Sequence, residues 1–383
     1  MYSLKEASAT AREPDIAATI DAVDRYLLAA SGPARFRQAR NSADAAVEVA
    51  AYGGLAVLGL AQAVVPEAQG GSGLPPGVVA LVAERLGHAL AREPYAENIV
   101  LPVALLLALP AAPGVAALLD AAGKGEILCV AWQERAFDLP TADAIATTLT
   151  CEGAGLRLKG TKRFVMGARA STRLVVLATL EGKPTLVCVP SSKAQRLDKT
   201  LADGTCWSEL EFDALLADSD ILARGPDCLP ALTRALDLTN LCIAGLLHGL
   251  QSRILELTLE YLNTRVQFDK PLGAFQALQH RAVELYNHAQ ITRFLLGEAI
   301  DATTAEVPAE TLAAYASRAK ARASDAALRI AKEGIQMHGG IGFSDEYDLG
   351  LYVKRILVLS AWLGGAEWHR RRYAALESAG IEA

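Results

Sequence analysis

The stretch Thr264–His280 is TRVQFDKPLGAFQALQH, and it decides the fold of this chain. A long segment with helical apolar periodicity, residues 229–265, ends there at an arginine, with an aromatic residue close behind. A Pro-Leu-Gly turn follows, and a second periodic segment begins at Phe275-Gln276. The string therefore predicts two long helices joined by a tight corner.

The side chains at this corner suit a ligand with a phosphate and an aromatic ring. Arg265 is able to grip a phosphate through two parallel N–H donors. Gln267 offers polar contacts, and Phe268 offers a face to an aromatic ring. An ordinary corner between two helices, with Arg265 in a salt bridge, explains the same residues. On spacing alone both interpretations stay open.

The bulk composition is typical of a mainly helical enzyme with more than one domain. The chain has 383 residues, too many for one ordinary core. Hydrophobic residues make up 52%, charged residues 21%, and the net charge is −6 with both signs interspersed, so there is no basic footprint for nucleic acid. Six cysteines are scattered without a CxxC pair or a histidine cluster, which predicts reduced thiols and no metal site.

The sequence predicts neither a targeting signal nor a membrane span. The first residues, MYSLKEASATAREPD, are polar and charged, unlike a signal peptide. Residues 98–119 are nearly all apolar, but Pro102, Pro110 and Pro113 divide them into pieces shorter than a bilayer span. We expect buried helices there and a cytoplasmic protein.

Three regions with different patterns of apolar residues follow one another, which predicts a mainly α fold with a central β domain. Residues 1–124 show helical periodicity broken by turns. Residues 125–224 hold short, partly alternating runs, which predict five or six strands in an antiparallel barrel or sandwich. Residues 225–383 return to long helical periods that suit a bundle. Strands are expected at 127–132, 145–150, 156–159, 173–179 and 185–189, and long helices at 229–265, 276–296 and 308–337.

A second string, Ile335–Arg355, is IQMHGGIGFSDEYDLGLYVKR. Gly339 and Gly340 follow a predicted helix and allow the backbone to come close to a ligand, and Gln336 precedes them by one turn. A helix C-cap followed by a loop is the plain alternative. His338 beside such a cap is usually structural.

A third string, Leu158–Thr179, is LKGTKRFVMGARASTRLVVLAT. It predicts a strand, a tight turn and a strand, with Phe164 and Met166 on one face. An ordinary strand pair with both residues in the core is the alternative.

Together with the Pro66–Leu74 loop, PEAQGGSGL, these strings resemble the acyl-CoA dehydrogenase family over nearly the whole chain. The strings LGHALAREPY, AWQERAFD and LGGAEWHRRR resemble its heteromeric branch, in particular small subunits such as that of pimeloyl-CoA dehydrogenase. The resemblance implies an N-terminal helical domain (1–124), a middle β-barrel (125–224) and a C-terminal four-helix bundle (225–383).

The resemblance also implies FAD as cofactor and an acyl-CoA as substrate. The corner at Arg265 would hold the pyrophosphate and adenosine side of FAD across a subunit interface, and the His-Gly-Gly segment would pass close to the same cofactor. Phe164 would stand behind the isoalloxazine ring. The positions implied for the cofactor are Arg265, Gln267, Phe268, Gln276, Gln336, Gly339, Gly340, Phe164 and Gln133.

Two positions implied to contact the flavin ring depart from the family pattern. A Thr-Glu-Pro string followed by Gly-Ser is usual, whereas AWQERAFDLP puts Gln133 where the threonine stands. Met166 replaces a hydroxyl residue expected after GTKRFV. We expect weaker flavin binding or altered redox tuning from these two changes. Asp269, where glycine is commoner, is a minor departure.

The implied reaction removes the α-proton of a thioester while hydride leaves to flavin, so it needs a positioned carboxylate. The family keeps a glutamate in the loop before the last helix, or on the first long helix of the bundle. These positions are Gly364 and Thr239 here. Glu367 suits the first turn of the last helix, and Asp237 lies on roughly the opposite face from Thr239. We therefore assign no catalytic residue.

Several hypotheses follow from the missing base. In the first, the chain is one subunit of a heteromeric dehydrogenase whose partner chain carries the glutamate. An extreme form of this hypothesis is a subunit that has lost flavin and serves only in assembly. Otherwise the chain is a self-sufficient dehydrogenase with an unrecognised carboxylate, or a flavin-dependent oxygenase of the same fold. The two missing glutamates favour the first hypothesis, and the retained Arg265 corner argues for flavin. Small residues at 364–366 predict a roomy acyl pocket. The FAD contacts implied across a subunit interface predict at least a dimer.

Overall fold

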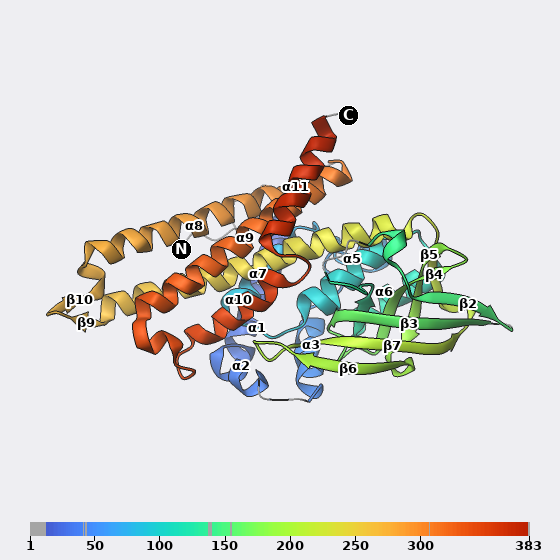
Figure 1. Cartoon of the computed structure of the whole chain (residues 1–383), viewed down its shortest axis with the longest axis horizontal. Coiled ribbons are helices and arrows are strands. Elements are labelled where there is room, and N and C mark those ends of the chain that lie inside the picture. The colour runs from blue at the N-terminus through green and yellow to red at the C-terminus, as the bar shows by residue number, and fades with distance from the viewer. Residues whose placement is uncertain are drawn as a thin grey trace. The chain divides into compact units, whose positions relative to one another are not determined.

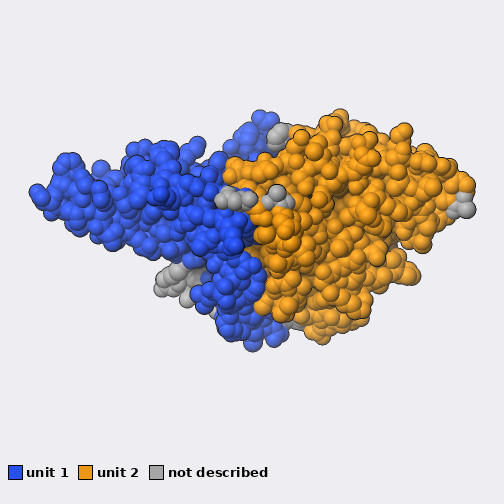
Figure 2. Space-filling view, turned by 90° about the horizontal axis from the view of Figure 1, so that it is seen from below, with its two compact units in different colours: residues 1–41, 75–92, 240–383 blue, residues 42–74, 93–239 orange. Residues whose placement is uncertain are grey.

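The structure is a computed structural model that describes residues 13–40, 42, 44–136, 140–153, 155–305 and 307–381. The chain forms two compact units, each assembled from separate segments (Figure 2). Unit 1 contains residues 1–41, 75–92 and 240–383, and unit 2 contains residues 42–74 and 93–239. The predicted fold, mainly helical with a central sheet, is confirmed. The three-part division at 124/125 and 224/225 stays a prediction.

Unit 1 is a helical bundle in which α9 is the central helix, since it contacts α8, α10 and α11 (Figure 1). The buried face of α9 consists mainly of alanine, which lets neighbouring helices approach closely. The helices predicted at 229–265 and 308–337 end within a residue or two of the observed ends, whereas the one predicted at 276–296 continues to Ala302. The helices of this unit are α1 (Glu13–Ala30), α2 (Pro33–Arg40), α4 (Val78–His88), most of α7 (Cys228–Thr264), α8 (Gln276–Ala302), α9 (Ala309–His338), α10 (Leu349–Ala361) and α11 (Ala366–Ile381).

The helix α4 belongs to this bundle because it crosses α7 backbone against backbone. A Cβ added at Gly245 would lie 2.3 Å from the carbonyl oxygen of Ala80, and one at Gly87 would lie 2.1 Å from that of Leu246. Only glycine permits so close a crossing. The segment therefore folds with helices that lie far along the sequence.

Unit 2 is built on a mixed sheet in the strand order β6-β7-β3-β2-β4-β5-β8, with β1 also paired to β4. The prediction of a purely antiparallel domain is wrong, because β1 and β2 both run parallel to β4, one at each end of it. The strands are β1 (Leu128–Ala131), β2 (Thr148–Glu152), β3 (Gly155–Met166), β4 (Arg173–Leu180), β5 (Lys183–Pro190), β6 (Ala194–Thr200), β7 (Cys206–Leu216) and β8 (Ile221–Arg224).

One face of the sheet encloses the core of unit 2. Alternate residues of β1, β2, β3, β4, β5 and β7 meet in a single apolar cluster that includes Leu158, Val176 and Phe212. Helical segments of the same unit pack on its strands: β1 contacts η3 and α5, and β8 contacts α6. These helical segments are α3 (Ala46–Val57), the π-helical η3 (Ala96–Val100), α5 (Leu101–Ala108) and α6 (Pro113–Gly123).

Two segments of the chain are strongly apolar. The segment predicted to form buried helices contains α5 and α6, with Pro110 between them, as expected. The stretch Leu349–Ser378 is long and apolar enough to cross a membrane by length and composition. However, it consists of α10 and α11, and 50% of its most apolar window is buried inside the chain. Helices in the core of a folded protein reach the same length and hydropathy.

Candidate functional site

The corner between α7 and α8 is a two-residue hairpin. The strands β9 (Val266–Gln267) and β10 (Lys270–Pro271) pair, and η7 (Leu272–Ala274) leads into α8 (Figure 1). Phe268 and Asp269 both have positive φ, 54° and 63°, as two-residue hairpin loops require. This explains why glycine is commoner at position 269, and aspartate is one of the residues that tolerate the conformation.

The side chains of this corner point away from unit 1. Arg265, Gln267 and Gln276 are exposed, and the Phe268 side chain is 85% exposed. The Phe268 ring lies edge-on to Phe275, with 6.3 Å between ring centroids. No carboxylate pairs with the Arg265 guanidinium among the described residues. The alternative interpretation, a corner held by a salt bridge of Arg265, therefore has no support in the part of the chain that the structure describes.

The His-Gly-Gly segment ends α9 and exposes backbone. Gly339 has φ 64° and begins η8 (Gly339–Phe343), as predicted for a C-cap. A Cβ added at Gly339 or Gly340 would meet no atom within 4 Å, and Gln336 is exposed one turn earlier. Open backbone next to a polar side chain is what close approach by a ligand requires.

His338 is structural. Its imidazole is 3% exposed and stacks on Tyr261 with 4.5 Å between ring centroids. Nδ1 lies 2.7 Å from the Gly334 carbonyl oxygen and Nε2 lies 3.0 Å from the Tyr347 hydroxyl. Burial is the main cause that lowers the pKa of His338, so the ring is neutral near pH 7.

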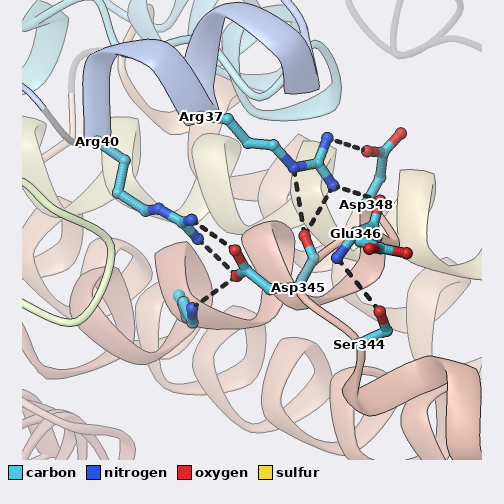
Figure 3. Close-up of polar contacts among 7 residues, drawn as sticks. Arg37, Arg40, Ser344, Asp345, Glu346 and Asp348 are labelled. Carbon is cyan, nitrogen blue, oxygen red and sulfur yellow. Dashed lines mark hydrogen bonds and ion pairs between the residues drawn. The ribbon is translucent and has the colours of Figure 1, made fainter.

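Two arginines of α2 hold the loop that follows η8 (Figure 3). Arg40 donates to both carboxylate oxygens of Asp345, at 2.8 Å and 2.7 Å. Arg37 donates to Asp348 at 2.7 Å and to the carbonyl oxygen of Glu346 at 2.8 Å. The hydrogen bond from Arg40 is the main cause that lowers the pKa of Asp345. Sequence reasoning missed this cluster because its partners lie about three hundred residues apart and no local motif joins them.

In unit 2 the order strand, turn, strand predicted for Leu158–Thr179 is confirmed, but the turn lies at residues 167–170, between β3 and β4. The GTKRFV string itself forms a β-bulge inside β3. The pairing of β3 with β7 shifts between Lys162 and Val165, and Phe164 takes φ 57° at this irregularity. Its half-buried ring packs against Trp207, with 4.8 Å between centroids. A bulge re-aims a side chain without ending the strand, and here it sets the direction of Phe164.

The segment before this bulge is anchored by a buried ion pair that sequence reasoning missed. Lys162 is 0% exposed, and its Nζ lies 2.5 Å from Oε1 of Glu134. The same carboxylate accepts hydrogen bonds from the backbone N–H groups of Ala146 and Thr147, at 2.8 Å and 3.0 Å. Burial lowers the pKa of Lys162 to about 8, and Glu134 partly offsets the effect. The pair ties Glu134 to β3 and to the backbone at Ala146 and Thr147.

Gln133 and Met166 lack the hydroxyl groups expected at their positions. The side-chain amide of Gln133 donates to the Arg135 carbonyl oxygen at 2.9 Å, and the backbone carbonyl of Gln133 accepts from the backbone N–H of Arg163 at 2.8 Å. Met166 is 8% exposed, and its carbonyl accepts from the Cys129 thiol at 3.1 Å. Residues 137–139 of the AWQERAFDLP string lie outside the described residues.

Both positions expected for a base lack a carboxylate. Gly364 has φ 109°, and a Cβ there would lie 2.8 Å from Cε3 of Trp368 and 3.2 Å from Nε2 of His369. Thr239 is 0% exposed, and its hydroxyl donates to the Ala235 carbonyl oxygen at 2.8 Å. Asp237 is buried at 4% exposure.

Glu367 lies in the first turn of α11 and faces solvent. Its side chain is 62% exposed and pairs with Arg370 at 3.0 Å and Arg371 at 3.1 Å. The hydrogen bond from Arg370 is the main cause that lowers the pKa of Glu367. A carboxylate already paired with two arginines is a weak proton acceptor, so Glu367 is not assigned as a base.

Comparison with known proteins finds one family model and several relatives. The model described as acyl-CoA dehydrogenase, C-terminal domain, matches residues 229–376. Acyl-CoA dehydrogenase IpdE2 of Mycobacterium tuberculosis is 29% identical over 78% of this chain and 77% of the relative.

Solved structures with the same fold cover almost the whole chain. A variant of the Tcur3481-Tcur3483 steroid ACAD has a TM-score of 0.82 and 27% identity, over 97% of this chain and 99% of the other. The ChsE4-ChsE5 complex from Mycobacterium tuberculosis has a TM-score of 0.79 and 25% identity, over 97% and 98%.

Proposed function

The chain belongs to the acyl-CoA dehydrogenase family, and from this premise we propose that it is one subunit of a heteromeric, FAD-dependent acyl-CoA dehydrogenase. One observation carries the proposal: neither position at which the family keeps its base holds a carboxylate, since these are Gly364 and Thr239. A chain that keeps the fold without the base is complete only with a partner that supplies it. The proposed place of action is the cytoplasm.

The residues of unit 1 fit the pyrophosphate and adenosine end of FAD. The Arg265 guanidinium is exposed, and no carboxylate pairs with it among the described residues. Phe268 offers an exposed ring face, and the open backbone at Gly339 and Gly340 admits a close ligand. When bound, FAD supplies the acceptor for the hydride that leaves the β-carbon. In this proposal Arg265 holds a phosphate and Phe268 stacks on a ring.

The residues of unit 2 fit the flavin ring less well. Phe164 supplies the expected aromatic wall, but the Gln133 amide donates within its own loop and Met166 has no donor. This observation favours a second candidate function, a subunit that assembles the enzyme without a catalytic flavin of its own. No observation favours the oxygenase hypothesis.

An exposed apolar face on α8 supports the proposal that a partner chain binds here. Val283, Tyr286 and Phe294 lie on one side of this helix and are 57%, 51% and 67% exposed. Ile291 is 50% exposed at the edge of the same side. Large apolar side chains grouped in this way are typical of a surface that another protein covers. We propose that this surface, Val283–Phe294 of α8, packs against the second acyl-CoA dehydrogenase-like chain.

For the acyl group we propose a class of substrate and no single compound. A Cβ at Gly365 would meet no atom within 4 Å, whereas the space beside Gly364 is filled by Trp368 and His369. Room is therefore present at one of the two glycines. A long, branched or ring-bearing acyl-CoA suits this opening, and one similar structure is of a steroid ACAD.

The test is co-expression with a family member that carries the glutamate. We expect a stable complex whose flavin absorbance bleaches anaerobically with an acyl-CoA. Replacing the glutamate of that second chain with glutamine abolishes the bleaching, and Glu367→Gln in this chain leaves it unchanged. Loss of bleaching in Glu367→Gln alone contradicts the proposal, because the base then belongs to this chain.

A further inference from the structure

Lys320 is a buried lysine in the middle of α9. It is 0% exposed, and its Nζ lies 3.1 Å from the Leu359 carbonyl oxygen, 3.3 Å from that of Ser360 and 3.2 Å from that of Gly364. The fourth acceptor is the hydroxyl of Ser324, at 3.3 Å. No carboxylate pairs with this ammonium in the part of the chain that the structure describes.

Two of these carbonyls belong to the last turn of α10. The last carbonyls of a helix have no partner within it, and they carry the negative end of the helix dipole. An ammonium that satisfies them from another helix is a C-terminal cap. Because the third carbonyl is that of Gly364, the same cation joins the end of α10 to the loop that follows it.

This loop, residues 362–365, is also held from α11. Nε2 of His369 lies 3.1 Å from the Leu363 carbonyl oxygen, so this nitrogen carries the proton and donates it. His369 is 0% exposed. Burial, followed by Lys320 and Arg372, lowers the pKa of His369, so the imidazole is neutral.

The backbone of the loop leaves no place for a side chain at residue 364. Leu363 has φ 57° and Gly364 has φ 109°, and the second value is one that residues with a Cβ rarely adopt. With the Gly364 carbonyl turned inward to Lys320, a Cβ would point at the Trp368 ring, 2.8 Å from Cε3. The inward carbonyl and the blocked side-chain position are two aspects of one loop conformation.

We propose that Lys320 is a positioning residue that draws the carbonyl of residue 364 into unit 1 and so fixes the 362–365 loop in a form that presents backbone, and no side chain, where the family's loop carries its glutamate. The fixing of the loop rests on this structure alone. Its consequence for catalysis rests on the proposed function: restoring a glutamate at residue 364 does not make this chain a self-sufficient dehydrogenase.

Hydrogen exchange of the full chain tests the fixing of the loop. In Lys320→Met we expect the amides of residues 358–369 to exchange roughly tenfold faster or more, because the hydrogen bonds from Nζ to the carbonyl oxygens of Leu359, Ser360 and Gly364 are lost. Peptides of β3, β4 and β7 keep their protection. Lys162→Met is the matched control, because it removes an equally buried lysine from unit 2 and leaves 358–369 unchanged. Wild-type protection of 358–369 in a folded Lys320→Met overturns the proposal.

A second variant decides the matter if Lys320→Met does not fold. In Gly364→Glu we expect faster exchange confined to the same residues and no acyl-CoA-dependent bleaching of bound flavin. A Gly364→Glu protein with wild-type protection that bleaches with an acyl-CoA overturns the proposal. Bleaching of the wild-type chain purified alone contradicts the proposed function instead, while the exchange result still decides the role of Lys320.

Discussion

Lys162 in unit 2 and Lys320 in unit 1 are both 0% exposed, yet their positive charges are balanced in different ways. Lys162 meets a carboxylate, Glu134, at 2.5 Å. Lys320 meets three carbonyl oxygens and a hydroxyl. Burial lowers both pKa values, to about 8 for Lys162 and to about 7 for Lys320. Glu134 partly offsets the effect of burial on the pKa of Lys162, whereas burial alone lowers the pKa of Lys320.

The two lysines also hold different kinds of structure. Lys162 holds a strand bulge and the segment around Glu134, next to Gln133 and Met166, which are proposed to lie at the flavin ring. Lys320 is proposed to fix the loop at residue 364, where the resemblance implies the base. In both places the fold of the family is retained while the chemical group is changed, to Gln133 and Met166 in one and to Gly364 in the other.

The largest expected effect comes from breaking the pair in unit 2. Glu134→Ala leaves Lys162 buried without its carboxylate, which costs about 3–5 kcal/mol in free energy of unfolding. Urea unfolding measures the loss. The double variant Glu134→Leu with Lys162→Met recovers the part of the loss that comes from the unpaired charge, whereas the N–H groups of Ala146 and Thr147 stay without their acceptor. A single variant that loses less than about 1 kcal/mol contradicts the account of this pair.

The next effect is the pH dependence that Lys320 confers. An unfolded lysine has a pKa near 10, so between about pH 7 and pH 10 the unfolded state binds more protons at residue 320 than the folded state. The contribution of Lys320 to the free energy of unfolding is therefore present above about pH 10 and is lost as the pH falls towards 7. The free energy of unfolding of the wild type minus that of Lys320→Met should therefore rise from pH 7 to pH 9, by no more than about 3 kcal/mol.

Urea unfolding of both proteins at several pH values measures this slope. Lys162→Met provides the comparison, and its slope should begin near pH 8, where the folded-state pKa of Lys162 lies. A difference between wild type and Lys320→Met that stays flat from pH 7 to pH 9 shows that residue 320 does not titrate as described.

A smaller effect is expected at the two adjacent glycines. Gly364→Ala forces a side chain into φ 109° and against Trp368, so we expect a loss of about 1–3 kcal/mol in thermal or urea unfolding. Gly365→Ala is the matched control, because its Cβ would enter open space, and it should change stability by less than about 0.5 kcal/mol. Equal losses in the two variants contradict the described loop conformation.

The smallest effect is expected at the exposed cluster of Figure 3. Arg40→Ala removes a partly exposed ion pair with Asp345, and we expect a smaller shift of the urea midpoint than in Glu134→Ala or Gly364→Ala, because solvent screens exposed pairs. The loss should shrink in high salt, whereas the loss in Glu134→Ala should not. Unfolding at two salt concentrations distinguishes the exposed pair from the buried one.

Much of the fold is predictable from the sequence because its long helices carry strong periodicity and clear ends. Residues 229–265 and 308–337 were predicted within a residue or two, and Gly339 ends α9 as expected. The strands of the second half of the sheet were missed. In β7 the alternating string CWSELEFDALL contains a readable signal, whereas β6 is polar and mostly exposed and β8 has only four residues.

The candidate site likewise contains parts that the sequence predicts and parts that it does not. The corner at Arg265 and the glycines after α9 are local patterns, so they were found from the sequence. The roles of Lys162, Lys320, Arg37 and Arg40 depend on partners 28 to 311 residues away. In the string SRAKARAS nothing local distinguishes Lys320 from a solvated lysine, because only the packing of α9 removes it from water.

The most direct test of the central claim, that this chain has no base of its own, is an anaerobic acyl-CoA titration of the chain purified alone with FAD. We expect the flavin absorbance to stay unchanged with every acyl-CoA in a panel of straight, branched and ring-bearing chains. Bleaching by any of them, at a rate that Glu367→Gln or another carboxylate substitution in this chain abolishes, would contradict the claim.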